Sequence, residues 1–77
     1  MFHGERLKKL REDRSWSLQD LVFELAKIDF RITRQTIDLW ENGDTEPRAS
    51  DLKSLADFFG VTTDFFFDSE GNKQLVV

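Results

Sequence analysis

Apolar residues recur three and four positions apart in four separate stretches of this chain, and every stretch is short. That spacing puts apolar side chains on one side of an α-helix and is the main sequence signal for amphipathic helices. The predicted helices cover about residues 4–14, 18–28, 33–43 and 48–59. A chain of 77 residues has room for only one core, so these helices are expected to pack into a single domain.

Residue types at the edges of the stretches indicate where the helices begin and end. A serine or threonine precedes the second and third helices as an N-cap, and a glycine follows the third and fourth. A further threonine would cap a fifth, short helix in "VTTDFFFDSEG". The expected caps are Ser17, Thr33 and Thr62 or Thr63 at the starts, and Gly43 and Gly60 at the ends. The end, "NKQLVV", could be a strand or a frayed terminus.

The expected fold is therefore all-α, a compact bundle of about five short helices. Eight phenylalanines supply the large buried area per residue that so small a domain needs. Residues 1–67 are expected to form the domain. Residues 68–77 are expected to be a tail that either forms a strand or contributes to a dimer.

Composition excludes several classes of function. The chain has no cysteine, and its one histidine, His3, has no partner at metal-ligand spacing, so neither a metal site nor a cofactor is expected. No apolar run is long enough to cross a bilayer, and the start has no apolar stretch typical of a signal peptide. We therefore expect a cytoplasmic protein. A catalytic cleft is hard to fit into this size, and although Asp38 and Glu41 share a helix, no nucleophile and base accompany them.

The stretch "TRQTIDLWENG" combines an apolar inner side with an outer side that is built for contact. Ile37 and Trp40 are expected to be core, with Thr36 beside them. On a helical wheel the opposite side carries donors, acceptors and one leucine, namely Arg34, Gln35, Asp38, Leu39 and Asn42. The alternative is an ordinary solvated face.

The chain resembles the helix-turn-helix family of the lambda repressor and Cro proteins over about residues 4–67. The resemblance rests on an ordered set of motifs: "ERLKKLRE", "SLQDLVFELA", "TRQTIDLWENG" and "PRASDLKSLADFFGV". Positions that fit the family pattern are Leu21, Thr36, Ile37, Glu41, Gly43, Pro47, Leu52, Leu55, Ala56, Gly60 and Val61. The resemblance implies a DNA-binding domain whose third helix enters the major groove.

Roles follow from the resemblance residue by residue. Base-reading positions would be Arg34, Gln35, Asp38 and Leu39, suited in turn to guanine, adenine, the cytosine amine and the thymine methyl group. Contacts to the DNA backbone would come from Gln19, Arg31, Thr33, Asn42 and Arg48. The resemblance also pairs Arg11 with Glu41 in an ion pair that fixes the angle between two helices. The alternative is that these two are unrelated surface charges.

Three departures from the family pattern reduce the expected contacts to DNA. Leu18 stands where the family often has a glutamine, so Gln19 would have to substitute. Seven residues, 26–32, separate Leu25 from Thr33, where the family has about two. The loop after Gly43 is acidic, and the net charge of −4 arises entirely from residues 44–77, with three basic and seven acidic residues. Since each phosphate contact adds affinity, a second subunit is expected to supply more of them.

The expected function is that of a sequence-specific transcriptional regulator, most simply a repressor of bacterial or phage origin, bound to double-stranded DNA and associated with the nucleoid. It would act as a homodimer on a pseudo-palindromic operator. Its dimer surface would lie in the C-terminal part, at Phe65, Phe66, Phe67, Leu75 and Val76, unless these residues form a locally folded tail. One or two of the three phenylalanines are expected to be core. The alternative function is a protein-interaction module such as an antitoxin, with secondary DNA binding.

Overall fold

The computed structural model of this protein describes residues 1–67. This part of the chain is all-α, as predicted, and its elements are α1 (Gly4–Asp13), α2 (Leu18–Ala26), α3 (Arg34–Asn42), α4 (Ala49–Phe59) and the 3₁₀-helix η1 (Thr63–Phe66). The prediction of five helices holds for four of them. The fifth is a four-residue 3₁₀ turn whose N-cap, Thr62, makes no side-chain capping bond. The strand or frayed end predicted for "NKQLVV" lies outside the described residues.

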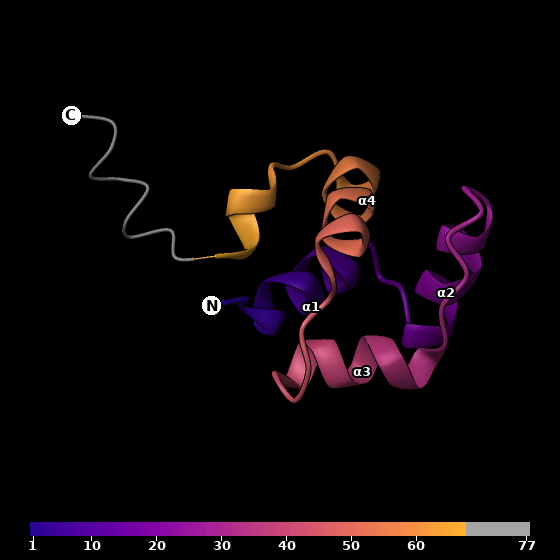
Figure 1. Cartoon of the computed structure of the whole chain (residues 1–77). Helices are drawn as coiled ribbons and strands as arrows, with labels where there is room; N and C mark the ends of the chain where they lie inside the picture. The colour runs from indigo at the N-terminus through magenta and orange to yellow at the C-terminus, as the bar shows by residue number, and fades with distance from the viewer. Residues whose placement is uncertain (68–77) are drawn as a thin grey trace.

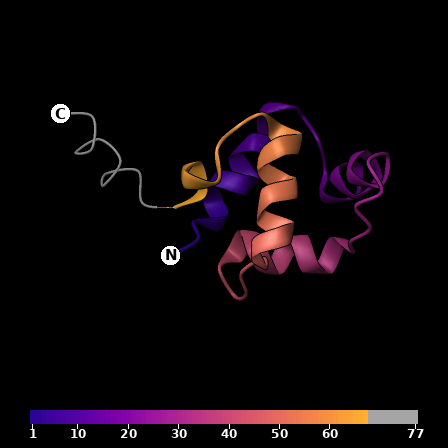
Figure 2. The same ribbon diagram turned by 45° about the horizontal axis from the view of Figure 1, so that its top comes forward.

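Helix α3 lies along one side of the domain (Figure 1). Helices α1 and α4 lie above it in that view, and α2 stands beside its first half. After a 45° turn, α4 is seen standing over α3 (Figure 2). The N-terminal residues run next to η1 in both views, because the His3 N–H donates to the Phe66 carbonyl oxygen at 2.7 Å. The Arg6 guanidinium adds a bond to the Phe65 carbonyl oxygen at 2.9 Å.

The helix ends follow from local capping chemistry. The Ser17 hydroxyl accepts from the Asp20 N–H at 3.0 Å, and the Asp20 carboxylate accepts from the Ser17 N–H at 2.9 Å. This reciprocal pair is a capping box, which satisfies two backbone donors at the start of α2. Gly43 and Gly60 end α3 and α4 with φ of 82° and 73°, in the left-handed region where glycine carries no steric penalty.

The connection from α2 to α3 is a true loop. Helix α2 ends at Ala26, slightly before the predicted end at residue 27 or 28. The chain turns because Asp29 adopts φ of 63°, and the Phe30 N–H then reaches back to the Leu25 carbonyl oxygen at 3.0 Å. Phe30 and Ile32 are half-buried against the core, so these two residues anchor the loop.

The core of the described domain draws on all five elements and on Phe2, two residues before α1. Its buried apolar side chains are Phe2, Leu7, Leu21, Leu25, Ile37, Trp40, Leu55, Ala56, Phe59 and Phe66. Phe66 is 0% exposed, so of the three consecutive phenylalanines it is the one that lies in the core and not on the surface of the domain. The 3₁₀ turn directs its ring inward, where it stacks on Phe2 with centroids 5.5 Å apart. Phe65 and Phe67 are half-buried, and Leu75 and Val76 lie outside the described residues.

Candidate nucleic-acid interface

Helix α3 is held rigidly from its inner side. Ile37 and Trp40 are buried in the core, as predicted, and Thr36 is half-buried beside them. The Thr33 hydroxyl accepts from the Thr36 N–H at 3.2 Å and caps the first turn. With both ends capped and one side packed, α3 is a fixed platform for the side chains on its other side.

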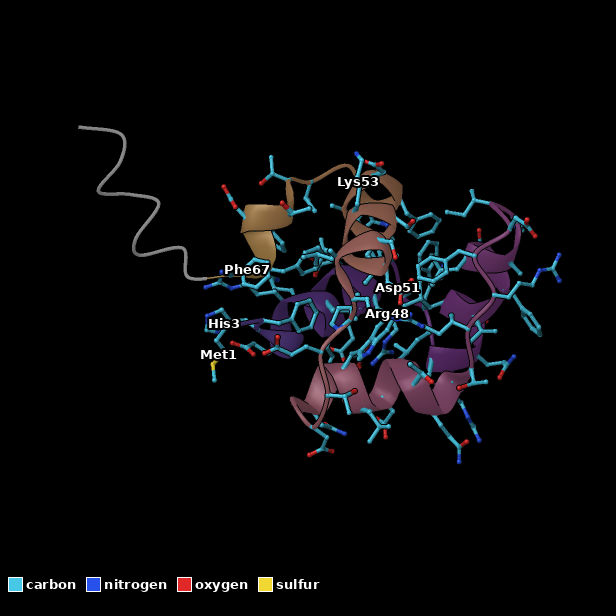
Figure 3. All side chains as sticks on the ribbon, in the orientation of Figure 1. Met1, His3, Arg48, Asp51, Lys53 and Phe67 are labelled. Carbon is cyan, nitrogen blue, oxygen red and sulfur yellow. The ribbon has the colours of Figure 1, made fainter. Side chains whose placement is uncertain are left out.

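The outer side of α3 is a polar surface that contains one large apolar side chain. The structure leaves all five predicted contact residues exposed, and they are Arg34, Gln35, Asp38, Leu39 and Asn42. Leu39 is 41% exposed although its neighbour Trp40 is buried. Side chains of α3 project below the helix in Figure 3, away from α1 and α4. The outer side therefore faces solvent without obstruction from the other helices.

Two residues on this outer side are linked to each other. The Asn42 side-chain amide donates to Asp38 Oδ1 at 3.3 Å, across one turn of helix. Residues four apart lie one above the other on a helix, so this bond orients both side chains. Asp38 retains further acceptor capacity on its carboxylate, because an ionised carboxylate offers about four lone-pair sites.

Behind α3, Arg11 and Glu41 form a bidentate ion pair. Arg11 Nε donates to Glu41 Oε2 and Nη2 donates to Oε1, both at 2.8 Å. The two side chains are only 10% and 3% exposed. The third donor, Nη1, is bonded to the Trp16 carbonyl oxygen at 2.8 Å. Hydrogen bonding to Glu41 raises the pKa of the Arg11 guanidinium against the opposing effect of burial. The pair thus joins α1, the α1–α2 connection and the last turn of α3.

The residues predicted to contact a DNA backbone are exposed but come from different elements. Gln19 lies in the first turn of α2, and Thr33 is the N-cap of α3. Arg31 lies in the α2–α3 loop, where its Nε is 3.3 Å from Asp29 Oδ1. Arg48 is the N-cap residue of α4 and is exposed, and its guanidinium, which has donors only, cannot cap that helix. Figure 3 shows Arg48 at the end of α4 nearest to α3.

Residues 1–67 also bear on two further features, namely clustered metal ligands and a helix that could span a membrane. No group of three or more histidine, aspartate or glutamate side chains in this part could hold a metal ion. Asp38 is exposed and Glu41 is buried, so these two carboxylates of α3 do not share a site. None of the helices described here is long and apolar enough to cross a membrane.

Sequence reasoning missed two residues that support α3. Phe2 is buried in the core, and its N–H lies 3.4 Å from Glu46 Oε2 in the loop after α3. Gly4 is buried at the first position of α1, against the backbone of Trp40 and Glu41. A glycine inside the first turn of a helix is itself a signal, because glycine is a poor helix former.

Comparisons with known proteins agree with this geometry. A family model described as a helix-turn-helix domain matches residues 4–72. The SPbeta prophage-derived uncharacterized HTH-type transcriptional regulator YonR of Bacillus subtilis (strain 168) is 40% identical over 62 residues. The match covers 80% of this chain and 53% of that protein, so the chain spans about half the length of this relative. No solved structure matches the chain.

Proposed function

Because this chain belongs to the helix-turn-helix family of transcriptional regulators, we propose that it binds duplex DNA by sequence, with α3 in the major groove. The observation that carries the proposal is the outer side of α3. Four polar side chains and Leu39 are exposed there, while the opposite side of the same helix packs into the core. A major groove admits a single α-helix, and each base pair presents a distinct pattern of donors, acceptors and methyl groups there. The subtype we propose is that of the lambda repressor and Cro proteins.

The base-reading residues are assigned by their chemistry and by their place on α3. Arg34 and Gln35 stand in the first turn, the part of a recognition helix that reaches base edges first. Arg34 suits guanine and Gln35 suits adenine, whereas Asp38 would accept from a cytosine amine and Leu39 would lie against a thymine methyl group. The bond from Asn42 to Asp38 holds the carboxylate in place for such a contact.

Contacts to phosphate would position the domain without reading sequence. Gln19, Arg31, Thr33, Asn42 and Arg48 are the residues proposed for this role. The loop after α3 contributes Asp44 and Glu46, which repel phosphates, so one copy of the domain has few favourable charges near the groove. We propose that two copies bind together on a pseudo-palindromic operator, with the dimer surface formed by Phe65, Phe67 and residues after 67. Repression, rather than activation or catalysis, is the simplest outcome of occupying such a site, and the protein would then reside at the nucleoid.

The proposal is tested by selecting bound sequences from a random duplex library and then replacing Gln35 with alanine. Gln35→Ala is expected to weaken binding to the selected site by about 1–3 kcal/mol and binding to random DNA very little, because only a base contact carries sequence information. The matched control is Gln19→Ala, which removes the same side chain from a phosphate-contacting position and should weaken both kinds of binding equally. Titrations with labelled duplexes give both affinities.

The proposal fails if the library yields no preferred sequence, or if alanine at Gln35, Asp38 and Leu39 together leaves the preferred sequence unchanged. In that case α3 does not read bases. A protein partner for the acidic half of the chain, as in an antitoxin, would then be the better account of its function.

Arg48→Ala tests the assignment of phosphate contacts. It is expected to weaken binding to selected and random DNA together and to reduce the slope of log affinity against log salt by about one, since one fewer counterion is released. Lys53→Ala is the matched control, because Lys53 lies farther from α3 on the same helix and pairs with Asp57 at 3.3 Å. An unchanged salt slope in Arg48→Ala would show that its guanidinium does not reach a phosphate.

A further inference from the structure

Gly4 lies where the backbones of α1 and α3 come into direct contact. A Cβ built on Gly4 would overlap the carbonyl oxygen of Trp40 and would lie 2.6 Å from that of Glu41. Both of these oxygens belong to the last turn of α3. No side chain fits between the two helices at this point, so the absence of one at position 4 determines how closely they approach.

Local helix energetics alone would favour alanine at this position. Glycine in a helix loses more conformational freedom than any other residue, and alanine is the best helix former. No left-handed backbone angle requires glycine here, in contrast to Gly43 and Gly60, which have positive φ and open space around a Cβ. The close approach to α3 is therefore the physical reason for a glycine at position 4.

The contact at Gly4 acts together with the Arg11–Glu41 pair. Gly4 lies against the backbone of Glu41, while the Glu41 side chain reaches Arg11, seven residues further along α1. Seven residues of helix correspond to about 10 Å. The two contacts are separated along α1 but meet α3 at the same residue, so together they fix where the last turn of α3 lies against α1.

We propose that Gly4 is a positioning residue for DNA recognition, and this rests on the proposed function of α3. A Cβ at position 4 would lie 2.0 Å from the Trp40 carbonyl oxygen and would force the two backbones apart by roughly 1.3 Å or more, because carbon–oxygen contacts require about 3.3 Å or more. The proposed phosphate contacts outside α3, from Gln19, Arg31 and Arg48, would hold the domain on the DNA backbone while α3 moved relative to it. Hydrogen bonds to base edges tolerate such a displacement poorly, since they weaken steeply with distance and angle.

Gly4→Ala tests this inference, with Gly60→Ala as the matched control. Gly60→Ala is expected to lower stability through its positive φ of 73°, with no contact to α3. Residual dipolar couplings of the backbone amides, measured without DNA, report the orientation of α3 relative to α1. For Gly4→Ala we expect a changed orientation of α3 and a fall of about tenfold in the ratio of affinities for the selected and a scrambled duplex. For Gly60→Ala, studied below its melting temperature, we expect the wild-type orientation and the wild-type ratio.

Each outcome separates this inference from the proposed function. A wild-type α3 orientation in Gly4→Ala would overturn the inference, and so would an altered orientation with an unchanged affinity ratio. A wild-type chain that shows no sequence preference would overturn the proposed function instead, while the dipolar couplings would still decide whether Gly4 positions α3. If Gly4→Ala is unfolded in buffer, the same measurements in trimethylamine N-oxide, which favours compact states, decide the question.

Discussion

Glu41→Ala is expected to lower the free energy of unfolding by about 3–5 kcal/mol, because it leaves the Arg11 guanidinium buried without its anionic partner. Both side chains are almost fully buried, and the pair contributes two hydrogen bonds of 2.8 Å. The Trp16 carbonyl oxygen alone cannot compensate for the lost charge. A chain of 77 residues has a total stability of about 4–12 kcal/mol, so this variant should be close to the limit of folding.

Urea unfolding followed by circular dichroism measures this effect in a double-mutant cycle. Arg11→Ala and Glu41→Ala should each destabilise the domain, and the double variant should lose less than the sum, with a coupling of at least about one kcal/mol. The matched control is Glu24→Ala, which breaks a pair with Lys27 of 3.0 Å between more exposed side chains and should change stability by at most about 1 kcal/mol. Full additivity of Arg11→Ala and Glu41→Ala would contradict the role assigned to the pair.

Phe66→Ala is expected to destabilise the domain by about 3–5 kcal/mol, the usual range for removing a fully buried aromatic ring. The ring stacks on Phe2 and meets the edge of Phe65 with centroids 5.5 Å apart in each case. Its removal would leave a cavity at the point where the N-terminal residues, α1 and η1 are joined. The midpoint of urea unfolding measures the loss.

Phe65→Ala is the comparison that separates core from surface in the same turn. Phe65 is half-buried, so we expect a smaller loss of stability than for Phe66→Ala. If Phe65 belongs to the proposed dimer surface, its replacement should also shift the protein on operator DNA from two copies per site toward one, as measured by sedimentation. Equal losses of stability in the two variants would contradict the burial of Phe66 described above.

Local chemistry accounts for the parts of the fold that could be predicted from the sequence. The apolar spacing within α1 to α4 and the caps at Ser17, Thr33, Gly43 and Gly60 involve residues at most about four positions apart. Such short-range patterns are visible in the order of the residues. The outer side of α3 follows in the same way, since the positions opposite Ile37 and Trp40 on a helix must face outward.

The sequence could not choose between neighbouring residues that give equivalent signals. Three consecutive phenylalanines, 65–67, look alike in sequence, and only the phase of η1 and its packing on Phe2 select Phe66 for the core. The end of α2 was placed slightly too late because Lys27 and Ile28 are compatible with a helix. The left-handed turn at Asp29, supported by the burial of Phe30, ends it earlier.

The order of residues was therefore enough to establish an all-α chain of the helix-turn-helix family and to mark the outward side of α3. The tertiary structure decided how that side is held. Arg11 and Glu41 are 30 positions apart, Arg6 and the Phe65 carbonyl are 59 apart, and Gly4 meets the backbone of residues 40 and 41. Helix and capping bonds act between near neighbours, whereas burial and close backbone approach depend on how distant segments pack, and no local pattern specifies that packing.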